Sequence, residues 1–84
     1  MLSKRIIAAE VTKVQNKYID NKGWLNYSRK IEDNVKYLDK ELEELFKSFN
    51  IPFFVDCFSD DISIIILMTF VVEGKLERIK IDLV

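Results

Sequence analysis

The chain has 84 residues, of which 49% are hydrophobic and 32% charged, so it is expected to form one small globular domain rather than a disordered chain. Thirteen basic residues against fourteen acidic ones leave a net charge of −1, which argues against a nucleic-acid or anionic-membrane binder that works by bulk electrostatics. Histidine is absent and Cys57 is the only cysteine, which excludes histidine-dependent nucleophilic catalysis, an internal disulfide and a cysteine-based zinc site.

The first predicted element is a helix over residues 3–20. Ser3 is a candidate N-cap residue, because its hydroxyl can accept a hydrogen bond from the first helical turn. Gly23 suits the left-handed position that follows a helix end. Four apolar residues recur at helical spacing and should face the core: Ile7, Val11, Val14 and Tyr18.

The second predicted element is a helix over residues 24–49, ended by Asn50 and Pro52. Its start is left open: Trp24 begins it, or Asn26 or Ser28 caps it. Trp24 and Tyr27 are expected at the corner between the two helices. The apolar stripe covers fewer than three heptads, so packing on the protein's own sheet explains it better than a coiled coil does. The stripe advances in steps of three and four residues: Ile31, Val35, Leu38, Leu42, Leu45 and Phe49.

Three strands are predicted to follow, over residues 52–58, 62–73 and 76–84. The central one contains the longest apolar run of the chain, residues 62–72, in which seven of eleven residues are β-branched. Such residues favour strands over helices. As a helix the run would span only roughly 16 Å, about half of a hydrocarbon core. The run therefore predicts a strand and no membrane association.

Two tight turns give a testable register. A type II′ turn at Gly74-Lys75 would set Met68 opposite Ile81, and a turn at Asp60-Asp61 would set Phe54 opposite Leu67. Both turns place apolar residues opposite apolar residues on the face turned toward the helices. That predicted core face consists of Phe53, Val55, Cys57, Ile64, Ile66, Met68, Phe70, Ile79, Ile81 and Leu83.

The resulting fold class is α+β: a two-layer sandwich of ααβββ order, with two antiparallel helices packed on one face of a three-stranded antiparallel meander. The opposite face of the sheet would then be left in water although it carries several large apolar side chains, and such patches usually mark an interaction site. The candidate interface residues are Phe54, Phe58, Ile65, Leu67, Val71, Arg78 and Lys80.

These features predict a non-enzymatic, cytoplasmic protein-interaction protein that uses no cofactor. It would form a homodimer or bind a protein partner through this face, or add a strand at the edge 76–84. Inhibitors and accessory proteins of phages and mobile elements are the class of small chain that we expect.

The alternative is a small nucleic-acid-binding module. It would use the basic residues of the first helix or the arginine and lysine of the sheet face. Interleaved acidic residues favour a solvated surface instead. The basic residues concerned are Lys4, Arg5, Lys13 and Lys17, together with Arg29 and Lys30.

Two further groups have simpler structural explanations. Cys57 falls on the predicted core face, where a small packed hydrophobe is expected rather than a reactive thiol. Asp60 and Asp61 lie where a tight turn favours aspartate, so turn formation explains them better than acid–base catalysis or metal binding.

Overall fold

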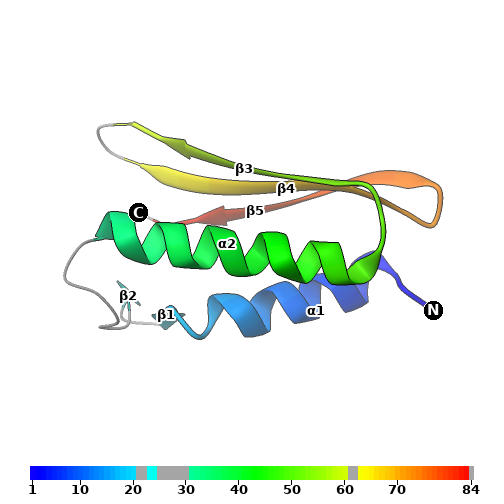
Figure 1. The fold of residues 1–84 in the computed structure, drawn as a ribbon, viewed down its shortest axis with the longest axis horizontal. Helices are drawn as coiled ribbons and strands as arrows, with labels where there is room; N and C mark the ends of the chain where they lie inside the picture. The colour runs from blue at the N-terminus through cyan, green and yellow to red at the C-terminus, as the bar shows by residue number, and fades with distance from the viewer. Residues whose placement is uncertain (21–22, 25–30, 61–62, 84) are drawn as a thin grey trace.

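The computed structural model describes residues 1–20, 23–24, 31–60 and 63–83. Figure 1 shows two layers, with two antiparallel helices below a three-stranded antiparallel sheet of order β3-β4-β5. The predicted fold class is thereby confirmed. The elements are α1 (Lys4–Gln15), β1 (Ile19–Asp20), β2 (Gly23–Trp24), α2 (Ile31–Phe49), β3 (Phe53–Ser59), β4 (Ile64–Val72) and β5 (Lys75–Asp82).

Helix α1 begins as predicted but ends earlier. Ser3 caps it, accepting a hydrogen bond from the backbone N–H of Ile6 at 3.3 Å. The backbone N–H groups of Lys17 and Tyr18 then bond to carbonyls three residues earlier, which tightens the chain after the helix. Ile19–Asp20 pairs with Gly23–Trp24 in a small two-stranded sheet. The predicted helical extension to residue 20, and Gly23 as its terminator, are therefore wrong.

The tight turn after α1 keeps Tyr18 against α2. Its side chain is 8% exposed, and its hydroxyl donates a 2.7 Å hydrogen bond to Glu41 Oε1. Lys17 Nζ lies 3.1 Å from Glu41 Oε2. The hydrogen bond from Tyr18 is the main reason why the pKa of Glu41 is lowered, with the contacts to Lys17 adding to the effect against partial burial. This pair joins the end of α1 to the middle of α2.

Replacing Tyr18 by phenylalanine is expected to lower the free energy of unfolding by about 1–2 kcal/mol at pH 7, because a hydrogen bond to a carboxylate is lost. The folded-state pKa of Glu41 is depressed, so its contribution is present above the ordinary value of 4.5 and is lost as the pH falls through the lowered pKa. Urea unfolding at pH 7 and pH 3 should show the difference between wild type and variant shrinking. An equal difference at both pH values would contradict this role of the carboxylate.

Helix α2 ends as predicted and begins elsewhere. It stops at Phe49, after which Asn50 takes the left-handed conformation with φ 57°. Trp24 belongs to β2, so a helix start at that residue is wrong. The alternative caps Asn26 and Ser28 lie among residues 25–30, which are outside what the structure describes, as is the side chain of Ile31.

The buried arc of α2 is wider than the predicted stripe. Leu38 and Leu42 are fully buried as expected, but so is Phe46, which the stripe passed over. Leu45 and Phe49 are only partly buried. The reason is that α2 contacts both α1 and β3, so one narrow seam does not describe the side chains that it buries.

The register between β4 and β5 differs from the predicted one by two residues. Val72 pairs with Lys75, and the two turn residues are Glu73 and Gly74, with φ 54° and 73°. Positive φ at both central positions is the signature of a type I′ turn, whose twist matches that of the flanking strands. Met68 consequently lies opposite Ile79 rather than Ile81.

The register between β3 and β4 is also shifted by two residues. Ser59 pairs with Ile64, and the backbone N–H of Asp60 donates to the Ser63 carbonyl at 2.9 Å. Asp60 Oδ1 accepts bonds from the backbone N–H and the hydroxyl of Ser63, at 2.7 and 3.0 Å. Asp60 therefore shapes the turn from its first position instead of occupying its centre. Phe54 lies opposite Thr69, not Leu67; residues 61 and 62 are outside the described part.

The core lies between the sheet and the helices, around Phe46. The ring of Phe46 is 5.2 Å from that of Phe70 and 5.7 Å from that of Phe53, measured between centroids. A two-residue shift leaves every side chain on its original face, so the predicted core face is confirmed for the fully or nearly fully buried Ile66, Met68, Phe70, Ile81 and Leu83, and for the partly buried Phe53, Val55, Ile64 and Ile79.

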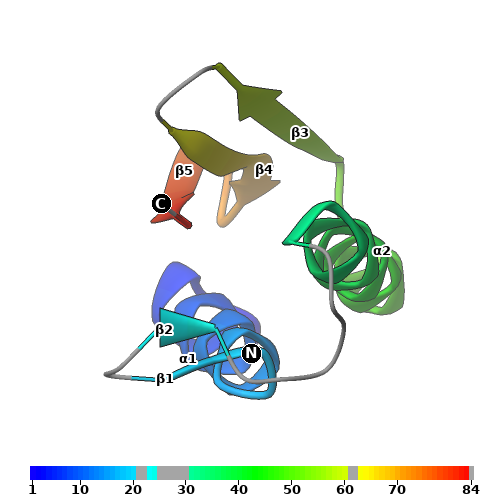
Figure 2. The same ribbon diagram turned by 90° about the vertical axis from the view of Figure 1, so that its left-hand side faces the viewer.

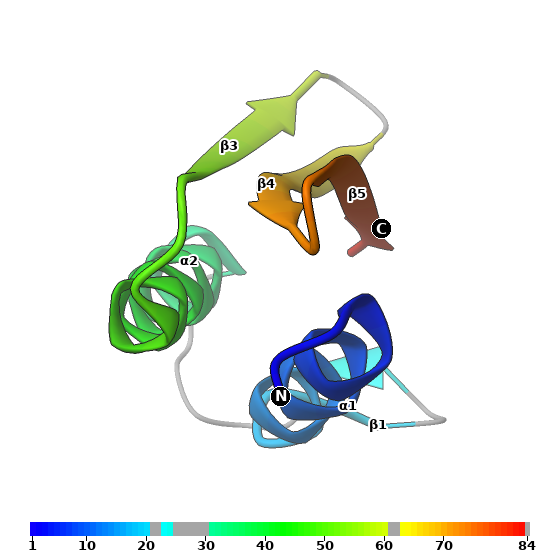
Figure 3. The same ribbon diagram turned by 90° about the vertical axis from the view of Figure 1, so that its right-hand side faces the viewer.

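Cys57 is the exception on that face, because its side chain is exposed. Figures 2 and 3 view the fold from opposite ends and show β3 twisted away from the helix layer. Along β3 the inward side chains pass from half-buried at Phe53 and Val55 to exposed at Cys57. The prediction of a packed core cysteine is therefore wrong.

Candidate interaction surface

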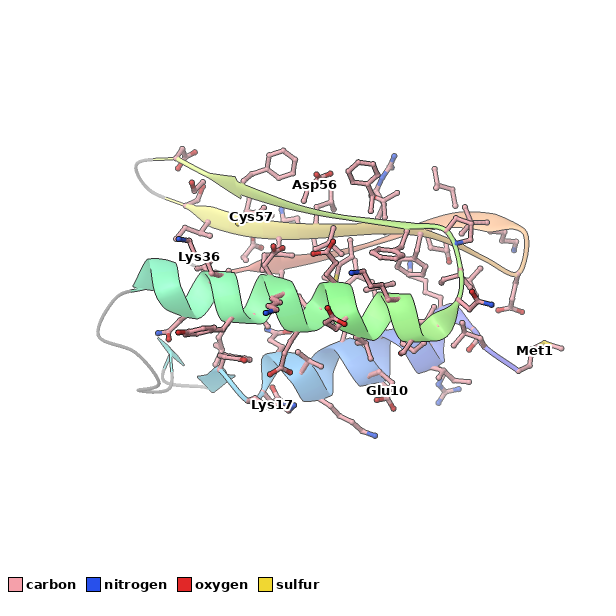
Figure 4. All side chains as sticks on the ribbon, viewed as in Figure 1. Met1, Glu10, Lys17, Lys36, Asp56 and Cys57 are labelled. Atoms are coloured by element: carbon pink, nitrogen blue, oxygen red, sulfur yellow. The ribbon has the colours of Figure 1, made fainter. Side chains whose placement is uncertain are left out.

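The side of the sheet away from the helices is called the outer face, and it comprises the side chains that alternate with the core residues along the strands. In Figure 4, Asp56 lies on this side, opposite the helix layer. Pairing aligns these side chains in three rows across the sheet: Phe54–Thr69–Arg78, Asp56–Leu67–Lys80 and Phe58–Ile65–Asp82, with Val71–Leu76 as a shorter row beside the β4–β5 turn.

All seven candidate interface residues lie on the outer face. The exposed fractions of Phe54 and Phe58, on β3, are 66% and 54%. Ile65, Leu67 and Val71, on the central strand, are partly covered by their neighbours. Arg78 and Lys80 are exposed on β5. The structure therefore brings these seven residues together on one surface, as the alternation of each strand indicates.

Leu76 belongs to the same surface and was missed from the sequence. It is 60% exposed and pairs with Val71 at the start of β5. The predicted turn at Gly74-Lys75 put it in the first pair beside the turn. Its parity with Arg78 and Lys80 was the signal that could have placed it on the outer face.

A shallow apolar depression of about 200 Å³ lies at the β4–β5 turn end of this surface. Phe54, Val71 and Leu76 contribute its outward-facing wall, and Pro52 lies at its rim, where the Pro52 carbonyl accepts a 3.1 Å bond from the backbone N–H of Val71. Exposed aromatic and aliphatic side chains around a depression can receive an apolar side chain of another protein.

The charges of the outer face are separated by strand. The β3 side carries Asp56, and the β5 side carries Arg78 and Lys80, with Lys80 Nζ 3.7 Å from Asp82 Oδ1. Burial, followed by the charges of Glu43 and Asp56, raises the pKa of Asp39, which lies on α2 near this edge. On the outer face itself, β3 thus contributes one anion, Asp56, and the middle of β5 contributes two cations, Arg78 and Lys80.

The thiol of Cys57 lies beside a second open depression of about 200 Å³, which Val35, Lys36 and Ile64 also line. Partial desolvation and then the negative charge of Asp39 raise the pKa of Cys57. A raised pKa disfavours the thiolate, which is the nucleophilic form. Among the described residues, the charge that acts on the thiol is that of Asp39, which disfavours the thiolate.

Three of the candidate basic residues in and after α1, Lys4, Lys13 and Lys17, have acidic neighbours. Lys4 Nζ is 3.9 Å from Glu77 Oε2, and Lys13 Nζ is 3.2 Å from Glu10 Oε1. Lys17 is paired with Glu41, as described above. These pairs reduce the positive potential that a phosphate backbone would meet. Arg29 and Lys30 lie outside the described residues.

Within the described residues, no group of three or more His, Cys, Asp or Glu side chains is placed to hold a metal ion. None of the described helices combines the length and apolarity that a membrane crossing requires.

Comparison with protein-family models, with curated proteins and with solved structures finds no match to this chain.

Proposed function

We propose that the chain is a non-enzymatic protein-interaction domain that binds through the outer face of its sheet. The supporting observation is the exposure of Phe54, Phe58 and Leu76, each more than half accessible, around a central strand of partly covered apolar residues. The helices cover only the other face of the sheet. A contiguous apolar surface with a charged margin is typical of a protein-binding site.

Two further features are consistent with this proposal. Strands β3 and β5 are both edges of the sheet, so β5 offers backbone groups for strand addition as a second route of association. Cys57 is an exposed free thiol, which persists most readily in a reducing compartment. We therefore place the interaction in the cytoplasm.

A double substitution on the outer face tests this function. Phe54→Ser with Phe58→Ser is expected to abolish the specific association of the protein, whether with its own copies or with a protein captured from its source cells. The reason is that truncating exposed aromatic anchors removes the main apolar contacts of an interface. Sedimentation of the purified protein and affinity capture with a tagged chain provide the two measurements.

Tyr37→Ser is the matched control, because Tyr37 is 55% exposed but lies on α2 in the helix layer. Association should survive this change. Equal association of wild type and the Phe54→Ser/Phe58→Ser variant would refute the outer face as the binding surface. Salt-sensitive binding of the wild type to nucleic acid would instead support the alternative function.

A further inference from the structure

The charges on the outer face differ between its two edge strands. Because of this difference, two copies of the face can pair so that the acidic side of one meets the basic side of the other. In the row Asp56–Leu67–Lys80, an anion and a cation flank an apolar residue of the central strand. In the next row, Phe54 and Arg78 flank Thr69. An aromatic ring and an arginine are likewise complementary.

Two copies packed face to face are related by a twofold axis that lies in the plane of the interface, and the two limiting directions of that axis are along the strands and across them. An axis along β4 sets β3 of one copy over β5 of its partner. Asp56 then meets the partner's Lys80, and Phe54 meets the partner's Arg78, each twice. An axis across the strands sets β5 over β5, so that cations of the two copies approach one another: Lys80 faces its own counterpart or the partner's Arg78, depending on where along the strands the axis lies.

Resting on the proposed function, we propose that the occupant of the outer face is a second copy of this chain, related by a twofold axis along β4. Leu67 meets the partner's Leu67 at the axis, flanked by the two Asp56–Lys80 contacts. Asp82 falls opposite the partner's Phe58 in the last row of the face, where its exposed carboxylate stays beside Lys80. The net charge of −1 per chain adds no large repulsion between copies.

The size of the face predicts a weak dimer. A central strand of nine residues at about 3.3 Å each, in three strands about 4.8 Å apart, covers roughly 30 Å by 14 Å. The area of this face is therefore smaller than the about 800 Å² that each partner buries in a standard interface. A dissociation constant on the order of micromolar is therefore expected, so the dimer should dissociate on dilution.

Opposite charge reversals provide the test. Asp56→Lys alone and Lys80→Asp alone each place like charges opposite one another twice in the homodimer, so each variant should lose at least about tenfold in dimer affinity. Mixing the two variants restores both attractive contacts, and a heterodimer should form with nearly wild-type affinity. Sedimentation equilibrium over about 1 μM to about 1 mM, with one variant carrying a fluorescent label, measures all three affinities.

Lys75→Asp is the control for net charge, since it lies on the same strand beside the turn, outside the face. Mixed with Asp56→Lys, it should not restore dimers. Stronger homodimers of Lys80→Asp would overturn the proposed orientation, because an axis across the strands sets position 80 near the partner's Arg78. Circular dichroism of each variant checks that these surface changes leave the fold intact.

A monomeric wild type at the highest concentration would overturn the dimer. If that monomer still captured another protein, and lost it with Phe54→Ser/Phe58→Ser, the proposed function would stand without the dimer. If the wild type formed dimers that the charge reversals and the phenylalanine substitutions left unchanged, the outer face would fail as the interface, and the proposed function with it.

Discussion

Replacing Phe46 by alanine is expected to remove most of the stability of this domain. The side chain is 0% exposed, and its ring contacts those of Phe49, Phe53 and Phe70. Truncating a buried phenylalanine costs about 3–5 kcal/mol, because apolar contacts are lost and a cavity remains. A domain of this size has a total stability on the order of 5–10 kcal/mol. The variant should therefore lose a large part of this stability and melt roughly 15–30 °C lower.

Calorimetry or thermal circular dichroism provides the measurement. Phe46→Leu should cost much less, since leucine fills most of the same volume. Tyr37→Ala, at an exposed site of the same helix, should change the free energy of unfolding by about 0.5 kcal/mol or less. A melting temperature of Phe46→Ala near that of Tyr37→Ala would show that Phe46 does not hold α2 against the sheet.

Phe46 also shows where reasoning from the sequence alone failed. Steps of three and four residues from Leu38 lead through Leu42 to Leu45 and Phe49, and they leave Phe46 off the stripe. That pattern assumes one contact seam, whereas α2 packs against α1 on one side and β3 on the other. The width of a buried arc depends on how many neighbours a helix has, and the helix sequence does not contain that number.

The faces of the sheet were predictable, but the register was not. Because side chains alternate strictly along a strand, a shift by two residues keeps every residue on its face. Both hairpins are shifted in this way, so Leu67 and Met68 point as expected although their partners changed. The predicted register was chosen because it set apolar residues opposite apolar residues, but this criterion did not exclude the real register. In the real register Phe70 lies opposite Glu77, and the carboxylate of Glu77 lies 3.9 Å from Lys4 Nζ.

The conformation of the turn between β4 and β5 explains why the observed register of this hairpin differs from the predicted one. Glu73 takes a positive φ, which is uncommon for a residue other than glycine, asparagine or aspartate, and a sequence pattern with Gly74-Lys75 favoured a type II′ turn instead. The structure uses Glu73-Gly74, so that Val72, 6% exposed on the core face, pairs with Lys75 next to the turn. The same shift set Asp56, Leu67 and Lys80 in one row, the arrangement on which the dimer proposal depends.

Leu67 and Met68 allow the strongest comparison between the two faces, because they are adjacent on β4 and point in opposite directions. Leu67→Glu is expected to weaken dimerisation at least about 100-fold, since two carboxylates would meet at the twofold axis. Its cost to monomer stability should stay near or below about 1 kcal/mol, the range of strand propensities on a partly exposed face. Met68→Glu buries a charge at a site with 0% exposure and should unfold the protein.

The same substitution thus separates association from folding at neighbouring positions. Urea unfolding at low micromolar concentration reports monomer stability, and sedimentation at high concentration reports dimerisation. A folded, monomeric Leu67→Glu together with an unfolded Met68→Glu is the expected pair of results. If Leu67→Glu also unfolded, the outer face would be part of the folding core of the monomer; if it remained dimeric, the interface would lie elsewhere, with the exposed edge of β5 as the next site to test.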